Sequence, residues 1–397
     1  MKKLLLATLL ASIFATSAQA ADDTINIGIE FGFTGPIESL APMMAASAEL
    51  ALKEVSDSKA LLGGKTLKGI RADDTCVDAA NATTAAERLV TSDKIVALIG
   101  ASCSGAATAV ANNVLIPKGI PMISSSATAP ALTTLDDKGF VFRTAPSDAR
   151  QGELLAEIVK NRGVDEVVIT YTNNDYGKGL NESFGAAFKK LGGKIVASTA
   201  HTDGQPDYSA DVAALKASGA KTLIVFGYAD QGGKGIVQAS LDSGAFDKFI
   251  FADGMIGEGL TKNFGTKING AFGTMPGGET EGSKKWEAIA KENKIDPTGG
   301  PYRGESYDAA AILALAIQAA GKADPAAIQA KIKDVANAPG EKIYAGELAK
   351  ALKLLSEGKD VDYVGATGVE FDDAGDVKGA YREVEVKEGK FETIKAY

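Results

Sequence analysis

The fold of this chain is decided by residues 95–106, which read IVALIGASCSGA. The stretch Ile95–Ile99 is continuously apolar, as expected of a strand that is buried on both faces. Gly100 ends that run, and small and hydroxyl-bearing residues follow it as a short loop. The apolar spacing of Ala106–Ile116 then predicts a helix. A buried strand followed by a loop and a helix is the repeating unit of α/β folds with parallel sheets.

The same alternation of strand and helix continues on both sides of this unit, in two blocks. Before a break near Phe142–Pro146, it predicts strands at Thr24–Phe31, Lys68–Ala72 and Pro121–Ser124 and helices at Met43–Ser56 and Ala79–Thr91. After the break it predicts strands at Val167–Tyr171, Lys194–Ser198, Thr222–Phe226 and Phe249–Ala252 and helices at Gly179–Leu191, Tyr208–Ser218 and Gly232–Ser243. We therefore expect two lobes, each a doubly wound parallel sheet with helices on both faces.

The end of the chain covers these sheets instead of repeating them. Gly304–Ala320 and Pro325–Val335 have the pattern of helices. From Gly368 onwards the pattern changes to short strands, with turns at Asp372–Asp376 and Glu388–Gly389. A hairpin that follows two α/β blocks indicates that the chain crosses between the lobes more than once.

Residues 1–20 have the layout of a secretory signal peptide. Two lysines precede an apolar run, Leu4–Ala15, and Ala18 and Ala20 are the small residues of a cleavage site before Ala21. The apolar run is about a dozen residues long, whereas a membrane-spanning helix needs about 20. We therefore expect export to the periplasm and removal of the leader.

Composition narrows the classes of function. The formal charge of the 397-residue chain is −9, and it becomes −11 without the two leader lysines. An acidic protein repels phosphate backbones, so no nucleic acid partner is expected. Cys76 and Cys103 each follow a predicted strand of the first lobe, and an isolated pair in an oxidising compartment predicts a disulfide. His201 is the only histidine, so no His-based metal site is expected.

The predicted binding site lies in five loops, because ligands bind open α/β sheets beyond the carboxyl ends of the strands. These loops follow Ile99, Ile123, Tyr171, Phe226 and Ala252. They carry, among others, Ser104 as a helix N-cap candidate, the hydroxyl-rich run Ser124–Pro130, and Tyr176, Tyr228 and Asp253. Taken singly, each of these residues is explained without a ligand, by helix capping, by core packing or by exposure to solvent. Together they offer donors for an anion from one lobe and acceptors for a cation from the other, which suits a zwitterion.

Enzyme motifs are absent from the sequence. It has no Gly-x-x-x-x-Gly-Lys-Ser/Thr, and no Gly-x-Gly-x-x-Gly follows the first strand. Ser104 stands where the nucleophile elbow requires glycine. We expect no catalytic residue, no metal and no cofactor. A secreted hydrolase is the alternative from another class, and His201 is the only imidazole that could serve as its base.

Several short motifs are spread along the chain after the leader: Gly32–Pro36, Asp73–Cys76, Ile99–Ser104, Pro121–Ser124, Ala127–Pro130, Asp175–Gly177, Ser306–Ala309 and Gly368–Asp372. With these motifs the chain resembles the periplasmic branched-chain amino acid binding proteins of ABC uptake systems, over essentially its whole mature length. The resemblance implies a type I periplasmic binding fold, in which two doubly wound lobes are joined by three crossovers. It places residues 21–144 and 273–362 in the N-terminal lobe and residues 145–272 and 363–397 in the C-terminal lobe.

The resemblance also implies a function and a set of ligand contacts. The lobes close by a hinge motion on an L-α-amino acid, expected to be branched-chain, and the monomeric protein delivers it to a membrane permease. The alternative ligand in the same fold is another small carboxylate or an amide. Carried over by position, the ligand carboxylate is bound by Ser104 and Thr128, the ammonium by the Ser126 carbonyl and Asp253, and the pocket is completed by Ala127, Tyr176 and Tyr228.

Two departures from the family pattern concern the end of the pocket that receives the ligand side chain. Glu38, Ser39 and Leu40 replace an expected aromatic residue in the first loop. Gly304 stands where a large aromatic residue is common. We expect Gly304 to enlarge the pocket.

Overall fold

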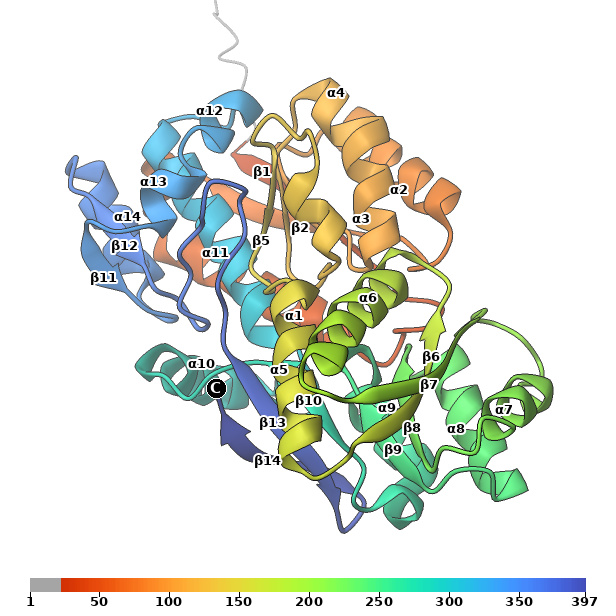
Figure 1. Ribbon diagram of the computed structural model, residues 1–397. Coiled ribbons are helices and arrows are strands. Elements are labelled where there is room, and N and C mark those ends of the chain that lie inside the picture. Colours follow the sequence, from red (N-terminus) through yellow and green to blue (C-terminus); the bar gives the residue numbers. More distant parts are fainter. Residues whose placement is uncertain (1–22) are drawn as a thin grey trace, which may run out of the picture.

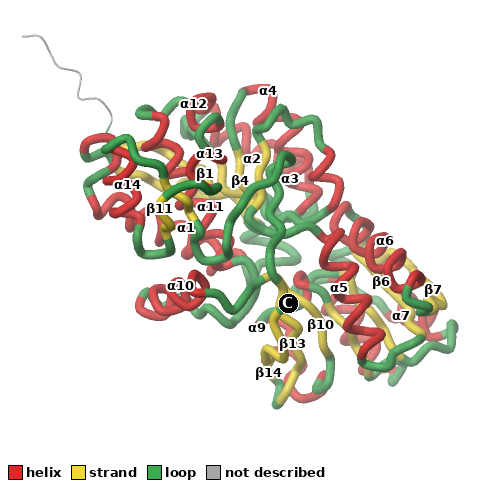
Figure 2. The backbone as a smooth tube through the Cα atoms, turned by 60° about the vertical axis from the view of Figure 1, so that its left-hand side comes forward, coloured by secondary structure: helices red, strands yellow, loops and turns green. Residues whose placement is uncertain are grey.

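A computed structural model, which describes residues 23–397, shows the chain as two α/β lobes (Figure 1). Helices surround the strands in both lobes (Figure 2). The signal peptide predicted at residues 1–20 and the cleavage before Ala21 lie outside the described residues. The expected fold class is confirmed, since each lobe is built on one large, mainly parallel sheet.

The first lobe contains a five-stranded parallel sheet with the order β2-β1-β3-β4-β5. Its strands are β1 (Thr24–Phe31), β2 (Thr66–Asp73), β3 (Leu98–Gly100), β4 (Met122–Ser124) and β5 (Val141–Arg143). In β1, Ile25, Ile27 and Ile29 share one face because side chains alternate along a strand, and all three are buried. That face is covered by α1 (Ala41–Ser58) and α11 (Arg303–Ala320), and the opposite face by α2 (Ala79–Thr91) and α3 (Ser104–Val110).

The second lobe contains a seven-stranded sheet with the order β14-β13-β10-β9-β8-β6-β7. The parallel strands are β6 (Glu166–Thr172), β7 (Lys194–His201), β8 (Thr222–Phe226), β9 (Lys248–Phe251) and β10 (Phe272–Pro276). The predicted late hairpin, β13 (Tyr381–Lys387) and β14 (Lys390–Ala396), adds antiparallel to β10 (Figure 1, blue). Helices α5 (Asp148–Asn161), α6 (Asp175–Lys190), α7 (Ser209–Lys216), α8 (Gly232–Ser243) and α9 (Glu258–Phe264) flank this sheet.

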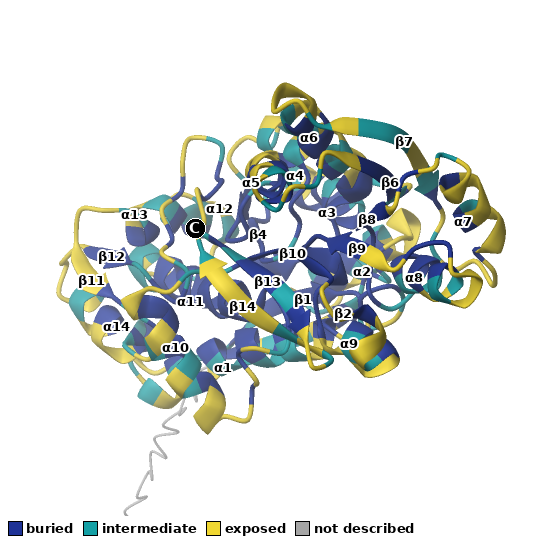
Figure 3. Ribbon diagram, turned by 60° about the horizontal axis from the view of Figure 1, so that its bottom comes forward, coloured by how far each residue is buried: buried dark blue, intermediate teal, exposed yellow. Residues whose placement is uncertain are grey.

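The remaining elements extend the first lobe and the region between the lobes. They are α10 (Glu281–Glu292), α12 (Pro325–Gln329), α13 (Ile332–Ala336), α14 (Leu348–Ser356) and a small sheet of β11 (Glu341–Ile343) and β12 (Val361–Tyr363). Exposed residues lie on the outer helices and on β14, whereas the central strands β8 to β10 are buried (Figure 3). Within residues 23–397, no single helix is long and apolar enough to cross a membrane; α11 taken with the following α12–α13 segment passes that test only as a pair bent by 109°.

Strand pairing moves two of the expected lobe boundaries. Residues 273–276, predicted in the first lobe, belong to β10 and pair with β9 and β13 of the second sheet. Residues 363–377, predicted in the second lobe, stay with the first lobe, because Tyr363 pairs with Ile343, Phe371 packs on Phe142 and Asp376 bonds to Arg143. The three crossovers therefore follow β5, follow β10 and precede β13.

The predicted disulfide is confirmed, with Cys76 and Cys103 joined at an S–S distance of 2.06 Å. Cys76 follows β2 and Cys103 follows β3, and these strands flank β1. The bond therefore ties together two loops at the carboxyl edge of the first sheet.

A buried ion pair fixes the first crossover. The guanidinium of Arg143, whose side chain is 2% exposed, contacts both carboxylate oxygens of Asp376 at 2.5 and 2.7 Å. It also donates to the Ala129 carbonyl at 2.9 Å and to the Thr133 hydroxyl at 2.6 Å. Arg143 thus connects the last strand of the first sheet, the Ala129 loop and the segment that leads to the third crossover.

We expect Asp376→Ala to lower the free energy of unfolding by about 3–5 kcal/mol, because it leaves the Arg143 charge buried without its carboxylate. Urea unfolding followed by circular dichroism measures the change. Asp373→Ala, three residues earlier at an exposed position of the same turn, is the matched control and should change stability by less than about 0.5 kcal/mol. Equal effects of the two substitutions would contradict this role of the ion pair.

Candidate functional site

A narrow cavity lies between the two lobes, at the carboxyl ends of both sheets. All five loops predicted to form the site contribute to it. The lining residues are Ile37, Leu40, Met44, Ser102, Cys103, Ser104, Ser126, Tyr176, Tyr228, Asp253, Gly254 and Tyr302. Within this set there is no lysine, arginine or histidine, so the one formal charge on the wall is the carboxylate of Asp253.

Ser104 presents its hydroxyl differently from the N-cap that the sequence predicted. The helix begins one residue earlier, with Cys103 in the cap position and no side-chain cap bond, and Ser104 is its first residue. The Ser104 oxygen accepts hydrogen bonds from the backbone N–H groups of Thr128 and Ala129, both at 3.1 Å. Since these bonds occupy its lone pairs, the O–H of Ser104 is available as a donor toward the cavity.

The loop after β4 brings Ser126 to the cavity wall. Its hydroxyl donates to the Ser102 carbonyl at 2.8 Å, which holds the loop against the neighbouring one. Among the described residues, none donates to the Ser126 carbonyl. Ala127 and Thr128 are buried behind Ser104 and do not line the cavity as the structure shows it. As ligand contacts, both stay predictions.

Asp253 occupies the second-lobe wall, in a short 3₁₀ turn (Asp253–Met255) directly after β9. The residue is 2% exposed. One carboxylate oxygen accepts the hydroxyl of Tyr176 at 3.2 Å, and the other accepts the hydroxyl of Tyr302. Burial raises the pKa of Asp253, and the hydroxyl donors partly offset that rise. A buried carboxylate in a wall without cations attracts a cationic ligand group.

Two tyrosines form the adjoining wall. The rings of Tyr176 and Tyr228 stack with centroids 5.2 Å apart and an interplanar angle of 23°. The Tyr228 hydroxyl accepts from the Asn174 amide at 3.2 Å, and the Tyr176 hydroxyl accepts from the Gly254 N–H at 3.2 Å. These bonds fix both rings, so the wall is rigid and the tyrosines need no ligand to be ordered.

The sequence interpretation placed the loop that contains Leu40 in the pocket, but it missed that this loop and the start of α1 supply the apolar end of the cavity. Ile37, Leu40 and Met44 come from the loop after β1 and the first turn of α1, and all are buried. The loop follows the carboxyl end of the first predicted strand, and ligands bind beyond the carboxyl ends of strands. The rule that identified the other five loops could therefore have identified this one. Tyr302, from the segment before α11, was also missed, because nothing local in the sequence places that segment beside Asp253.

Gly304 does not enlarge this cavity, so that expectation is wrong. A Cβ on Gly304 would lie 3.4 Å from side-chain atoms of Ala366 and Thr367. Gly304 faces a separate space next to Trp286. The helical turn at the start of α11 points residue 302, and not residue 304, toward the ligand cavity.

A second acid lies behind the site. Asp148, the first residue of α5, is fully buried, and its N–H donates to the Thr128 carbonyl at 2.9 Å. Burial, with a further contribution from the charge of Asp253, raises its pKa well above the usual value. The raised pKa favours the neutral form of Asp148, so the negative charge that opposes an anionic ligand is that of Asp253.

His201 lies apart from the cavity. Its ring is buried at the end of β7, Nδ1 is 2.8 Å from the Thr170 hydroxyl, and Tyr208 packs edge-on against it. Among the residues lining the cavity there is no imidazole to serve as a base. Residues 23–397 also contain no group of three or more His, Cys, Asp or Glu side chains that could hold a metal ion.

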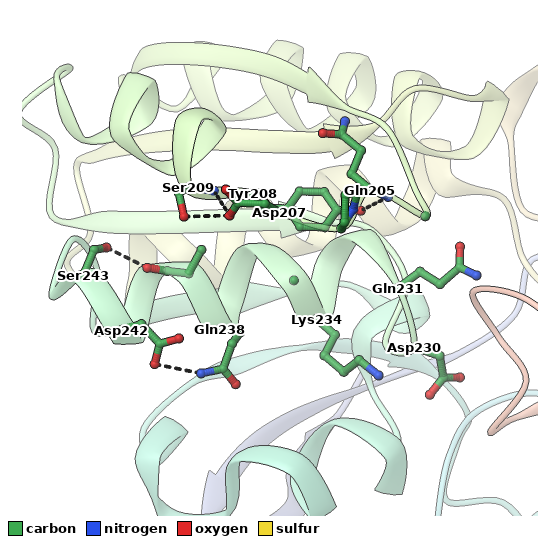
Figure 4. Close-up of a pocket in the computed structure, with 14 residues that line it drawn as sticks. Gln205, Asp207, Tyr208, Ser209, Asp230, Gln231, Lys234, Gln238, Asp242 and Ser243 are labelled. Atoms are coloured by element: carbon green, nitrogen blue, oxygen red, sulfur yellow. Dashed lines mark hydrogen bonds between the residues drawn. The ribbon is translucent and has the colours of Figure 1, made fainter.

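A wider groove runs along the outside of α8 (Figure 4). Its polar side chains bond to one another, as Gln238 does to Asp242 at 2.8 Å and Ser209 to Asp207 at 2.7 Å. The groove lacks the buried, converging polar groups that characterise a small-molecule site. The interlobe cavity has them and is the candidate site.

A family model described as periplasmic binding protein matches residues 24–347. The chain belongs to this family. The leucine-, isoleucine-, valine-, threonine- and alanine-binding protein of Pseudomonas aeruginosa is 28% identical over 315 residues, which cover 79% of this chain and 82% of that protein. The leucine-specific-binding protein of Salmonella typhimurium is 30% identical over 315 residues, which cover 78% and 84%. The resemblance read from the motifs is thus confirmed.

Solved structures share the fold. A leucine binding protein from Thermotoga maritima superimposes with a TM-score of 0.78 at 22% identity, covering 94% of this chain and 98% of that one. A solute binding protein from Rhodopseudomonas palustris, in complex with 4-hydroxybenzoate, gives a TM-score of 0.75 at 20% identity, covering 94% and 97%. The two neighbours show that one fold accommodates ligands with and without an ammonium group.

We expect His201 to make the protein less stable as the pH falls from about 6.5 toward 4. Burial lowers the pKa of folded His201 to about 4, whereas an unfolded histidine titrates near 6.5. The unfolded chain therefore binds the proton first, and the neutral ring contributes fully above pH 6.5 and loses its contribution as the pH approaches 4.

Urea unfolding of the wild type and of His201→Gln at pH 7 and pH 4.5 measures this effect. The buried acids titrate in both proteins, so the difference between the two pH dependences isolates the histidine. The wild type should lose up to about 3 kcal/mol more than the variant. An identical loss in both would show that His201 is not held neutral.

Proposed function

We propose that this protein is the substrate-binding component of an ABC uptake system and that it binds an L-α-amino acid with an apolar, branched side chain in the interlobe cavity. One relative is named for binding leucine, isoleucine, valine, threonine and alanine, and another for binding leucine specifically. The protein works in the periplasm, closes on its ligand by a hinge motion and passes it to a membrane permease. It performs no catalysis.

The observation that carries the proposal is the carboxylate of Asp253. It is buried, it lies in a wall without cationic side chains, and its side-chain partners, Tyr176, Tyr302 and Gln151, are all neutral. An α-ammonium group bound here gains a charge-assisted hydrogen bond in a largely desolvated site. The free carbonyl of Ser126 on the opposite wall supplies a second acceptor for the same group.

The other end of the cavity suits the α-carboxylate. Ser104 offers its O–H, and the first turn of α3 leaves backbone N–H groups without a side-chain cap. A ligand with ammonium and carboxylate on one carbon can therefore touch both lobes at once. Its side chain then meets Ile37, Leu40 and Met44, which favour an apolar group.

The fold alone leaves the aromatic carboxylates as a second ligand class, since a structural neighbour contains 4-hydroxybenzoate. Asp253 opposes this ligand class, because a carboxylate without an ammonium would meet a buried acid and no positive side chain among the lining residues. A secreted hydrolase is opposed by the position of His201, which is buried against Thr170 and does not line the cavity.

We expect L-leucine, L-isoleucine and L-valine to raise the melting temperature and to bind in titration calorimetry. Isoamylamine, which is leucine without its carboxylate, and 4-methylpentanoate, which is leucine without its ammonium, should bind at least about 100-fold more weakly, because each loses one charged end of the clamp. Stabilisation by 4-methylpentanoate or 4-hydroxybenzoate that equals the effect of leucine would rule out the amino acid assignment.

We expect Asp253→Ala to weaken leucine binding by about 2–5 kcal/mol, because the ligand ammonium would then be desolvated without a counter-charge. The unfolding free energy should change little or increase, since a buried acid is removed. Calorimetry gives the affinity, and Asp247→Ala, at an exposed position before β9, is the control that should bind as the wild type does. Unchanged affinity in Asp253→Ala would mean that the ammonium binds elsewhere.

A further inference from the structure

The loop after β1, residues 34–40, forms part of the roof of the ligand cavity. At its start it is fixed to the first lobe, since the Thr34 hydroxyl donates to Asp73 at 2.6 Å. At its end, Ile37 and Leu40 face the cavity and are 5% and 3% exposed. The loop therefore belongs to the first lobe, and its apolar side chains separate the cavity from solvent.

Asp230 of the second lobe holds the tip of this loop at two points. Its carboxylate accepts the N–H of Ser39 at 2.8 Å, and its own N–H donates to the carbonyl of Pro36 at 3.2 Å. Both bonds join one lobe to the other. Figure 4 shows Asp230 at the end of the α8 groove, next to the first-lobe segment drawn in pale red.

The contact is tightly packed on its second-lobe side. A Cβ on Gly259, at the start of α9, would lie 2.6 Å from the Ser39 hydroxyl and 2.8 Å from the Asp230 carboxylate. Only a residue without a side chain leaves the two groups at their present positions. The N-terminal turn of α9 therefore closes around the contact instead of leaving it as a loose surface pair.

Asp230 is linked to the ligand site through its own loop. Tyr228, which lines the cavity, is two residues earlier between β8 and α8, and Ala229 donates to the Gly254 carbonyl beside Asp253 at 2.9 Å. The segment that carries Asp230 is therefore joined directly to the wall that the ligand meets at Tyr228 and Asp253. The bonds to Pro36 and Ser39 can form only when the lobes are together.

We propose that Asp230 is a positioning residue, which holds loop 34–40 closed over the ligand without touching the ligand itself. This inference rests on the proposed function and adds to it the residue that sets how long the ligand stays bound. The Asp230 bonds exist only in the closed state, so they stabilise that state and not the open one. Their loss should therefore raise the dissociation rate of the ligand more than it lowers the association rate. It contacts main-chain atoms of the loop, so it does not select among ligand side chains.

We expect Asp230→Ala to weaken L-leucine binding about 5- to 20-fold, mainly through faster dissociation, with the order of preference among leucine, isoleucine and valine unchanged. Asp230→Asn keeps an acceptor for the Ser39 N–H, so its affinity for leucine should lie between those of the wild type and Asp230→Ala. Asp242→Ala, at another acidic position in the same groove, is the matched control and should bind as the wild type does. Calorimetry and stopped-flow displacement measure these quantities.

Hydrogen exchange supplies the readout that a general loss of stability would not produce. With leucine bound, the peptide containing Ser39 should exchange faster in Asp230→Ala than in the wild type, while β3 and β8 keep their protection. Ser39→Pro removes the backbone N–H that donates to the Asp230 carboxylate. Because both substitutions remove the same bond, the double variant should release leucine no faster than Asp230→Ala does. Additive effects, or an unchanged dissociation rate in Asp230→Ala, would overturn the inference.

The two proposals fail in different ways. If the wild type binds none of the amino acids, the proposed function is wrong, and exchange of the Ser39 peptide in the ligand-free wild type and Asp230→Ala still decides whether Asp230 holds the loop. If leucine binds and Asp230→Ala releases it no faster, the proposed function stands and Asp230 is only a surface residue of the closed form.

Discussion

A carboxylate removed from water has to be compensated, and in this protein the compensation of Asp253 organises the whole site. The acid lies between the hydroxyls of Tyr176 in the second lobe and Tyr302 in the segment that leads into the first-lobe helix α11. Two neutral donors offset part of the cost of burial, and an ammonium group would offset more. The closed arrangement of the lobes brings these groups together, so the stability of the closed state depends on what faces Asp253.

The rest of the fold supplies the other half of the clamp. The disulfide and the Ser104 bonds to the Thr128 loop hold the first-lobe loops in place, so the donors at that end are fixed before any ligand arrives. Fixed groups lose little entropy on binding. The second lobe carries the acid and the stacked tyrosines. In the proposed function the first lobe binds the carboxylate and shares the ammonium through Ser126, whereas only the second lobe supplies the Asp253 carboxylate. Binding free energy would then be gained fully only when the lobes meet, which would drive hinge closure.

Much of this could be predicted because strand ends are readable from sequence. The apolar runs that end at Ile99, Phe226 and Ala252 identify the edge of a parallel sheet, and residues just beyond such edges converge whatever the details of the helices. The pairing of the two cysteines followed from the same reasoning. These features depend on local pattern and on a general rule of sheet topology.

The remainder depends on contacts between distant segments. Tyr302 contacts Asp253, from which it is distant in the sequence, because the folded chain brings the two segments together. Gly304 faces away from the cavity because of how α11 is rotated against the sheet. The lobe boundary near residue 276 is set by pairing of β10 with β13, more than a hundred residues later. Local sequence patterns carry no information on helix rotation or on such late strand pairing.

A crystal structure of the complex with L-leucine would show whether Asp253 receives the ligand ammonium. We expect leucine in the interlobe cavity, with its nitrogen within hydrogen-bond distance of the Asp253 carboxylate and the Ser126 carbonyl, and its carboxylate at Ser104. Leucine bound in the groove along α8, or in the cavity with its carboxylate toward Asp253, would mean that Asp253 does not bind the ammonium.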